Sequence, residues 1–200
     1  MAKASYGGMI TREQFCFFES RTVARLICEG KTEQEVIDEV VADNLFQYPT
    51  ERSLVSISKA CYKRMMSLND MDLVKVVAYQ PMETAKQVCL YAMMKTYPVV
   101  WDFMTQVVGE KFRVFNMNFG MIDLNEFFMR LQDSNDEVAG WSDATIEKIK
   151  QVLRKLLVEN EYLDDVKADH LNSVYLESKL EECIRANGDD DALPAFNCLY

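Results

Sequence analysis

Apolar residues recur three or four positions apart through most of this 200-residue chain, and polar residues fill the positions between them. This spacing places apolar side chains on one face of an α-helix. Capping residues, Gly and Pro divide the pattern into segments. We therefore expect an all-α fold with at least eight helices and more than half of the residues helical. The expected helices cover residues 11–29, 32–43, 50–68, 70–77, 81–97, 98–112, 123–133, 142–160 and 176–187.

The stretch from Gly30 to Arg64 reads as two helices joined by a short turn. Thr32 and Glu35 have the spacing of a capping box, which defines the start of the first helix. Asn44 tolerates the left-handed backbone that ends many helices. Pro49 keeps the residue before it out of helical geometry, so the second helix begins at Pro49 or at the next residue.

The outer face of this second helix is basic, although the whole chain has a formal charge of −10. From Arg52 through Arg64 it contains four cations and no acid. A basic amphipathic helix held against a preceding helix is typical of a helix-turn-helix DNA reader. The candidate DNA-binding residues are Arg52, Ser53, Ser56, Lys59, Lys63 and Arg64. The alternative is an ordinary solvated face of a helical domain.

A second basic helix is expected to begin after Trp141, where Ser142 is placed to cap it, and to end at Asn160. Its apolar positions predict a core face. Its cations add four candidate DNA contacts, which are Lys148, Lys150, Arg154 and Lys155. The order of short helical piece, capped turn and basic helix is also compatible with a second helix-turn-helix. A solvated helix face explains the same pattern.

Composition supports a soluble helical protein. About half of the residues are apolar (49%), and seven Gly and four Pro are few for a protein built of strands and tight turns. No apolar run approaches the roughly 20 residues of a membrane span, and the N-terminus lacks the apolar stretch of a signal peptide. We therefore expect a cytoplasmic protein.

The negative charge is unevenly distributed. Residues 1–66 and 141–163 are each neutral, whereas residues 67–140 carry −4 and residues 164–200 carry −6. A uniformly acidic surface would repel DNA, but a polarised surface need only present its basic face. The same pattern allows an alternative, in which the acidic regions dock a basic protein.

Residues suited to catalysis or to metal binding are sparse. The six cysteines form no Cys-x-x-Cys pair, and most lie on apolar helix faces, so we expect reduced core thiols. The one histidine, His170, has no nearby set of metal partners or nucleophile. No Gly-rich phosphate loop is present. We expect no metal, no cofactor and no enzymatic activity.

We expect three regions that together form one compact unit. Residues 1–68 would hold the helix-turn-helix, residues 69–135 a central helical bundle, and residues 136–200 the second basic helix and the acidic tail. Three aromatic residues, Phe127, Phe128 and Trp141, are expected to be largely buried. The only extended segment expected is a short hairpin near residues 166–176.

Several local patterns, in order, resemble the BrxA family, whose small members are encoded in bacterial BREX phage-defence clusters. No single motif is specific, and the order and spacing over nearly the whole chain carry the resemblance. The motifs are Tyr6-Gly7-Gly8, Glu19–Leu26, Gly30–Val36, Asp43–Phe46, Arg64-Met65-Met66, Phe127-Phe128, Val138–Thr145 and Gly188-Asp189.

The resemblance implies a compact helical bundle similar to the antitermination factor NusB, with helix-turn-helix elements, double-stranded DNA binding and no catalysis. Other BREX proteins are implied as further partners. A protein–protein adaptor in the defence complex is the alternative function, and an RNA-binding role follows only from the likeness to NusB. No base-contacting residues are transferred from the family, so the candidate residues rest on charge and helix face.

Overall fold

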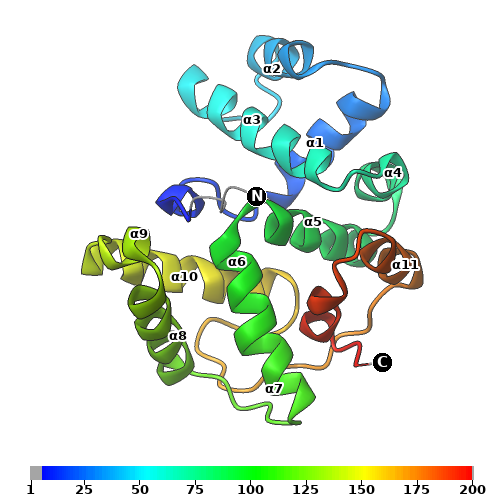
Figure 1. The fold of residues 1–200 in the computed structure, drawn as a ribbon. Coiled ribbons are helices and arrows are strands. Elements are labelled where there is room, and N and C mark those ends of the chain that lie inside the picture. Colours follow the sequence, from blue (N-terminus) through cyan, green and yellow to red (C-terminus); the bar gives the residue numbers. More distant parts are fainter. Residues whose placement is uncertain (1–5, 200) are drawn as a thin grey trace. The chain divides into compact units, whose positions relative to one another are not determined.

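The structure is a computed structural model that describes residues 6–199. Its elements are the 3₁₀-helix η1 (Gly8–Thr11), α1 (Phe17–Cys28), α2 (Glu33–Ala42), α3 (Glu51–Ser67), α4 (Met71–Tyr79), α5 (Met82–Thr96), α6 (Pro98–Phe103), the π-helical segment η2 (Met104–Gly109), α7 (Glu110–Arg113), α8 (Met121–Ser134), α9 (Asp136–Ala139), α10 (Asp143–Glu159), α11 (Ser178–Ala186) and the 3₁₀-helix η3 (Asp190–Phe196). The expected all-α class is confirmed (Figure 1). Within the described residues, no helix has both the length and the apolar character needed to cross a membrane.

The expected hairpin near residues 166–176 does not form. Within the described residues this segment makes one isolated antiparallel bridge, between His170 and Asn118. The backbone N–H of Leu171 donates to Met117 (2.7 Å), and that of Phe119 donates to the carbonyl of Asp169 (2.9 Å). The segment therefore pairs with the loop before α8 instead of folding back on itself.

Contacts divide the chain into two units. Unit 2 is Phe15–Thr96, and unit 1 is Tyr97–Tyr200 together with the described part of Met1–Gln14. Local composition predicts three regions, 1–68, 69–135 and 136–200. These regions stay a prediction, because the two units are defined by contacts and do not test them.

Unit 2 contains α1 to α5. Helix α3 packs against α1, α2 and α5, and α4 packs against α1 and α5. The last turn of α4 is capped from α1, because Arg21 and Arg25 both donate from Nε to the carbonyl of Ala78 (3.3 and 3.1 Å). Such caps satisfy backbone acceptors that a helix end leaves free. Helix α3 thus contacts three other helices while one of its faces remains outside.

In unit 1, α6, η2 and α7 follow one another as a continuous helical ribbon (Figure 1). The Phe103 ring of this ribbon makes edge contacts with Phe119 and Phe127, whose centroids lie 6.1 and 5.7 Å away. Phe127 and Phe128 are buried, as expected. Trp141 is intermediate in burial, so it is less enclosed than the two phenylalanines but still mostly covered. The phenylalanine rings therefore form one cluster within a core that also contains many buried aliphatic side chains.

Candidate nucleic-acid interface

The start of α2 is built as the sequence predicts. Thr32 and Glu35 form a capping box, in which the Thr32 side chain accepts from the backbone N–H of Glu35. The backbone N–H of Thr32 donates to the Glu35 carboxylate (2.8 Å), and this bond lowers the pKa of Glu35. The end of α2 is also as expected, since Asn44 has a left-handed backbone with φ 45°.

The connection between α2 and α3 is ordered by side chains. Asn44 accepts from the backbone N–H of Tyr48 (3.0 Å), and the Tyr48 hydroxyl donates to Glu19 of α1 (2.7 Å). Burial and this bond to the carboxylate raise the pKa of Tyr48. Thr50 then caps α3 by accepting from the backbone N–H of Ser53. The connection is therefore a defined structure.

This connection is longer than the sequence analysis expected. Eight residues, 43–50, separate the two helices. The turn of a helix-turn-helix motif usually has about three or four residues. The helix pair thus differs from the common motif at its turn. A contact of α3 with DNA would therefore depend on the exposed face of this helix itself.

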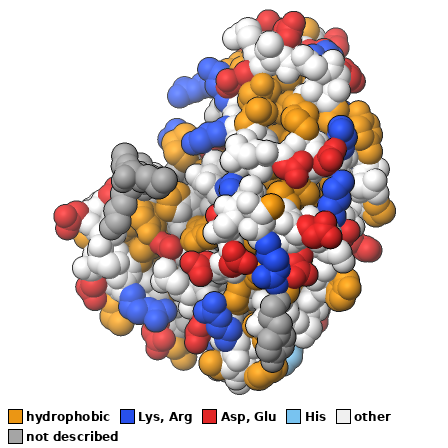
Figure 2. Space-filling view, turned by 45° about the vertical axis from the view of Figure 1, so that its right-hand side comes forward, with side chains coloured by type: hydrophobic (Ala, Val, Ile, Leu, Met, Phe, Trp, Pro, Cys, Tyr) orange, Lys and Arg blue, Asp and Glu red, His pale blue; other side chains and the backbone are white. Residues whose placement is uncertain are grey.

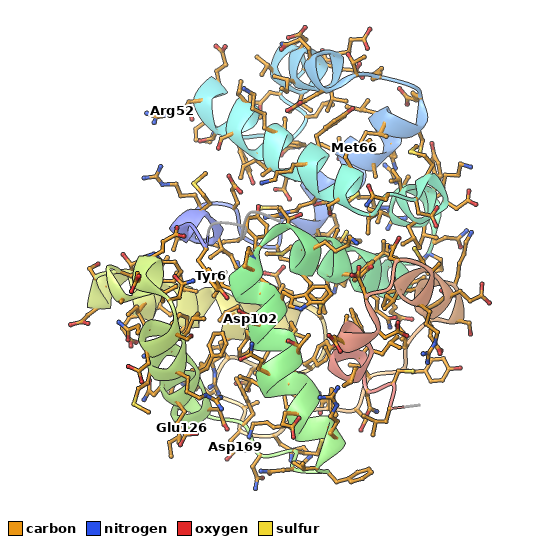
Figure 3. All side chains as sticks on the ribbon, in the orientation of Figure 1. Tyr6, Arg52, Met66, Asp102, Glu126 and Asp169 are labelled. Atoms are coloured by element: carbon orange, nitrogen blue, oxygen red, sulfur yellow. The ribbon has the colours of Figure 1, made fainter. Side chains whose placement is uncertain are left out.

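The exposed face of α3 is a single stripe along the helix. Its members are spaced four, three, four and three positions apart, which keeps them on one side. These exposed residues are Arg52, Ser56, Lys59, Lys63 and Met66. Arg52 and Met66 lie at opposite ends of the helix (Figure 3). We call this set the α3 stripe.

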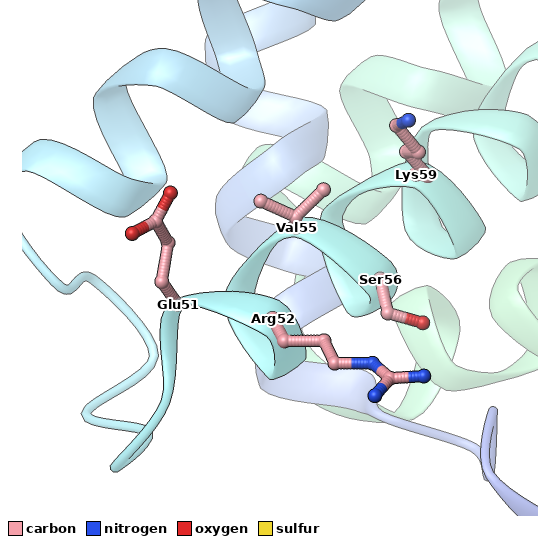
Figure 4. Close-up of a pocket in the computed structure, with 5 residues that line it drawn as sticks. All are labelled: Glu51, Arg52, Val55, Ser56 and Lys59. Atoms are coloured by element: carbon pink, nitrogen blue, oxygen red, sulfur yellow. The ribbon is translucent and has the colours of Figure 1, made fainter.

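The cations of the α3 stripe are not neutralised by neighbours. Among residues 6–199, no ion pair joins Arg52, Lys59 or Lys63 to a carboxylate. A shallow hollow of about 590 Å³ lies over the first half of the stripe (Figure 4). The residues that line it are Glu51, Arg52, Val55, Ser56 and Lys59. The stripe thus presents cations without ion pairs at the edge of a shallow, open hollow.

Two predicted residues of α3 do not belong to this stripe. Ser53 is partly buried, and its hydroxyl accepts from Thr50 Oγ1 (2.8 Å) in the cap of the helix. Arg64 is 1% exposed, and its Nη1 donates to the carbonyl of Phe15 (3.0 Å). The expectation that Arg64 lies on the outer face was wrong. Its spacing from buried Ile57 and Cys61, at i+7 and i+3, was the signal for a core position.

Two of the four candidate cations of α10 form hydrogen bonds or ion pairs with other residues of unit 1. Lys150 is 8% exposed, pairs with Glu147 (2.6 Å) and donates to Asn125 of α8 (2.7 Å). Arg154 donates to the carbonyls of Val166 and Ala168. These two side chains hold α10 to its surroundings and are not free to meet a phosphate.

The other two cations of α10 are exposed. Lys148 has no ion pair among the residues described, and Lys155 lies 3.5 Å from Glu159 and donates to Gln14 (3.3 Å). Exposed pairs of this kind contribute little to stability and exchange readily with solvent. Arg12, which sequence reasoning missed, is exposed just after η1, and η1 packs against α10. Only this packing brings Arg12 near the basic helix.

The helix that packs against α3 on one side is acidic. Helix α2, which packs against α3, contains four acids and no base. Lys31 pairs with one of these acids, Glu39, and with Glu29 (2.8 Å). Asp38 and Asp43 are exposed and have no ion pair among the described residues. A polyanion would therefore meet repulsion on the α2 side of the stripe.

The negative charge of the chain lies almost entirely in unit 1. Unit 2 carries ten Lys or Arg and eleven Asp or Glu, which is a net charge of −1. Unit 1 carries twelve and twenty-one, which is a net charge of −9. On the face drawn in Figure 2, basic and acidic side chains are interspersed and form no continuous field. The basic surface is therefore local, and the charges favour unit 2 for contact with a polyanion.

Groups suited to catalysis do not converge in the part of the chain that the structure describes. No three His, Cys, Asp or Glu side chains there gather as a metal site requires. Three of the cysteines, Cys61, Cys89 and Cys183, are buried. The Tyr6 hydroxyl donates to Asp102 of α6, and burial followed by this bond raises the pKa of Tyr6 (Figure 3). This contact fastens the N-terminal segment to α6.

Comparisons with known proteins identify relatives along nearly the whole length of the chain. The family model described as BrxA matches residues 4–188. A protein of Bacillus cereus described as "BREX protein BrxA" is 33% identical over 186 residues, which are 92% of each chain. A protein of Escherichia coli with the same description is 26% identical over 175 residues, which are 88% of this chain and 82% of the relative.

A solved structure has the same fold. It is the crystal structure of an uncharacterized protein from Magnetospirillum magneticum, and it matches with a TM-score of 0.81. The match covers 96% of this chain and 97% of that chain at 23% sequence identity. At this identity the likeness concerns the fold alone.

Proposed function

This chain belongs to the BrxA family and is a component of a BREX system, and we propose that it binds duplex DNA there through the α3 stripe. The proposed role involves no catalysis by this chain. Its partners are double-stranded DNA and other BREX proteins. The sequence-based hypothesis of DNA binding is retained, with a smaller set of contact residues.

One observation carries the proposal: three exposed cations without ion pairs lie on a single side of α3. Arg52 and Lys63 are eleven positions apart, which is about 16 Å along a helix. The major groove of B-DNA is about 12 Å wide. Cations at the two ends can therefore reach the phosphates on both sides of the groove, while Ser56 between them faces the base edges.

The contacts proposed for this mode are mostly electrostatic. Arg52, Lys59 and Lys63 neutralise phosphates, which contributes affinity with little dependence on sequence. Ser56 contributes sequence preference only if α3 enters the major groove. Lys148 and Lys155 of α10 form a second, weaker contact. Arg64, Lys150, Arg154 and Ser53 support the fold and are left out of the interface.

The test compares the parent protein with a Lys59→Glu/Lys63→Glu variant at matched salt. The variant should nearly lose duplex binding, because it removes two phosphate contacts and adds repulsion. The neutral variant Lys59→Ala/Lys63→Ala should keep weak binding with a salt slope lower by about 2. Both side chains are exposed, so the melting temperature of each variant should stay close to that of the parent, as is usual for surface substitutions.

A matched control is Lys167→Glu/Lys179→Glu, which changes the charge equally at two exposed positions of unit 1. Its DNA affinity should remain near that of the parent. Equal binding by the parent and the α3 variant would remove α3 from the interface. Stronger competition by an RNA duplex than by DNA of the same sequence would favour the RNA-binding alternative.

A further inference from the structure

Four large apolar side chains are exposed at the junction of α7 and α8 in unit 1. They are Val114, Phe115, Met121 and Ile122, with 59%, 74%, 45% and 72% of their surface exposed. Burying one such side chain is worth about 1.5–3 kcal/mol. A partner that buried all four of these side chains would therefore gain a large part of its binding free energy from them. We call them the α7–α8 patch.

A buried lysine brings the two halves of this patch together. Lys111 of α7, whose side chain is 11% exposed, pairs with Asp123 of α8 (2.6 Å). The same Nζ donates to the carbonyl of Asn118 in the loop (2.5 Å). The end of α7, the following loop and the start of α8 are thus joined through one ammonium group.

The patch is held outward by backbone bonds. The backbone N–H of Phe115 donates to the carbonyl of Phe112 (3.1 Å), and that of Asn116 donates to Lys111 (2.9 Å). Phe115 itself has a left-handed backbone with φ 53°, which is uncommon for a large side chain. These bonds keep the ring in an exposed position and define the geometry that a partner would meet.

Acidic side chains alternate with apolar ones along the outer face of α8. Ile122, Glu126, Met129 and Asp133 are spaced four, three and four positions apart, and all four are exposed. Neither Glu126 nor Asp133 has an ion pair among the residues described. Asp169, another exposed acid of this unit, also has none there, and Figure 3 shows it at the same end of unit 1 as Glu126.

Few cations offset these acids. Arg113 beside the patch pairs with Glu110 (3.4 Å), and Lys111 is used internally. Arg130 remains as an exposed cation on α8. With the net charge of −9 on unit 1, the surroundings of the patch attract cations.

We propose that the α7–α8 patch and the outer face of α8 dock a helical segment of another protein, with large apolar side chains on one face and Lys or Arg beside them. Helices bind exposed apolar surfaces through anchors at i, i+3, i+4 and i+7. The alternation of Ile122 and Met129 with Glu126 and Asp133 matches such anchors with interleaved cations. Charge complementarity sets the orientation and suppresses other partners.

The charge pattern selects this occupant over a second copy of the chain. In a two-fold symmetric dimer the same patch meets itself, so Glu126 and Asp133 would face carboxylates of the other copy. Like charges across an interface are costly. An anionic nucleic acid is disfavoured for the same reason. A basic amphipathic helix satisfies the apolar and the acidic residues together.

The probe for the test is a synthetic amidated helix of 21 residues, with leucines on one face and lysines elsewhere. The control probe has glutamates in place of the lysines. We expect the lysine peptide to bind at least tenfold more tightly than the glutamate peptide, by calorimetry at physiological salt. In NMR spectra of the labelled protein, the lysine peptide should shift the amides of residues 114–133.

Two double variants locate the site. Phe115→Ser/Ile122→Ser should weaken binding of the lysine peptide at least tenfold, whereas Met71→Ser/Tyr79→Ser, at exposed apolar positions of unit 2, should not. Glu126→Lys/Asp133→Lys should weaken binding of the lysine peptide and strengthen that of the glutamate peptide. The charge variant leaves the apolar residues in place. If the serine variant fails to fold, the charge variant alone therefore tests whether the peptide binds at this patch.

Three results would overturn the proposal. One is equal binding of both peptides, and another is an unchanged affinity in the charge variant. The third is a concentration-dependent dimer in sedimentation that Phe115→Ser/Ile122→Ser abolishes, which would assign the patch to a second copy. DNA affinity should be the same in the parent and in Phe115→Ser/Ile122→Ser, because this variant does not change the charge. The outcome for the α7–α8 patch can therefore be distinguished from the outcome for the α3 stripe.

Discussion

Arg64 of α3 donates a hydrogen bond from Nη1 to the backbone carbonyl of Phe15, at 3.0 Å, with both residues buried. Phe15 is followed by Cys16, whose left-handed backbone (φ 48°) leads into α1. A buried charge requires such partners, because its transfer from water is costly. The contact ties the second half of α3 to the start of α1.

Replacing Arg64 should therefore destabilise unit 2 and affect DNA binding only through the fold. Arg64→Ala leaves the Phe15 carbonyl without this donor and creates a cavity, so we expect a loss of about 2–4 kcal/mol in the free energy of unfolding. The neighbouring exposed Lys63→Ala should change it by about 0.5 kcal/mol or less. Chemical denaturation of both variants measures the difference, and similar stabilities would contradict the structural role.

Arg154 should behave as a structural residue of unit 1. Its guanidinium donates to two backbone carbonyls and lies over the Phe119 ring, 5.6 Å from the centroid. Arg154→Ala should cost roughly 1.5–3 kcal/mol of stability, the range for hydrogen bonds of charged groups. Lys155→Ala should leave stability nearly unchanged. A weakened DNA affinity in a fully folded Arg154→Ala protein would instead place this cation in the interface.

The acids of α2 should restrain DNA binding by α3. Neutralising Asp38 and Asp43 in a Asp38→Asn/Asp43→Asn variant removes repulsion beside the stripe without disturbing the capping box. The affinity for duplex DNA should rise about two- to fivefold at low salt, as expected for exposed charges. The gain should disappear as the salt concentration increases.

The control for this prediction is Glu126→Gln/Asp133→Asn, which neutralises two exposed acids in unit 1. It should leave the DNA affinity unchanged. An equal gain in both variants would mean that the net charge of the chain matters and that the position of α2 does not.

Alkaline pH should destabilise unit 2 through Tyr48. Burial and the bond to Glu19 raise the pKa of Tyr48 above its ordinary value of 10.0 in the folded state. The folded state therefore keeps a proton that the unfolded chain releases, so this contribution is present below pH 10 and is lost as the pH rises further. Thermal melts between pH 8 and 11.5 should show the decline.

Tyr48→Phe is the matching variant, since it removes the hydroxyl and keeps the ring. Its stability at pH 8 should be lower by about 0.5–1.5 kcal/mol because the hydrogen bond is lost. Above pH 10 its stability should fall less steeply than that of the parent. Parallel curves for the two proteins would show that another group governs the alkaline transition.

Most helices were readable from local sequence, but the start of the first long helix was not, because α1 begins at Phe17 and not at the expected Thr11. The capping box of Thr32 and Glu35 and the left-handed Asn44 all depend on neighbouring residues, and the structure contains both. Periodic apolar positions likewise predicted the buried Phe127 and Phe128. The capping box and the left-handed turn are set by contacts within a few positions of the chain, which a sequence pattern records directly. The apolar period of a helix, in turn, marks the side chains that face the core.

The tertiary structure determined which basic side chains are buried or hydrogen-bonded and which remain exposed. Lys63 and Arg64 are adjacent in the chain, but only Arg64 meets a buried carbonyl, which comes from a residue 49 positions away. In α10, Lys150 donates to a residue of α8, and Arg154 donates to a backbone carbonyl of the loop after α10. Lys148, by contrast, has no ion pair among the described residues. A helical pattern specifies the direction of a side chain, but the acceptor it finds there depends on how distant segments pack.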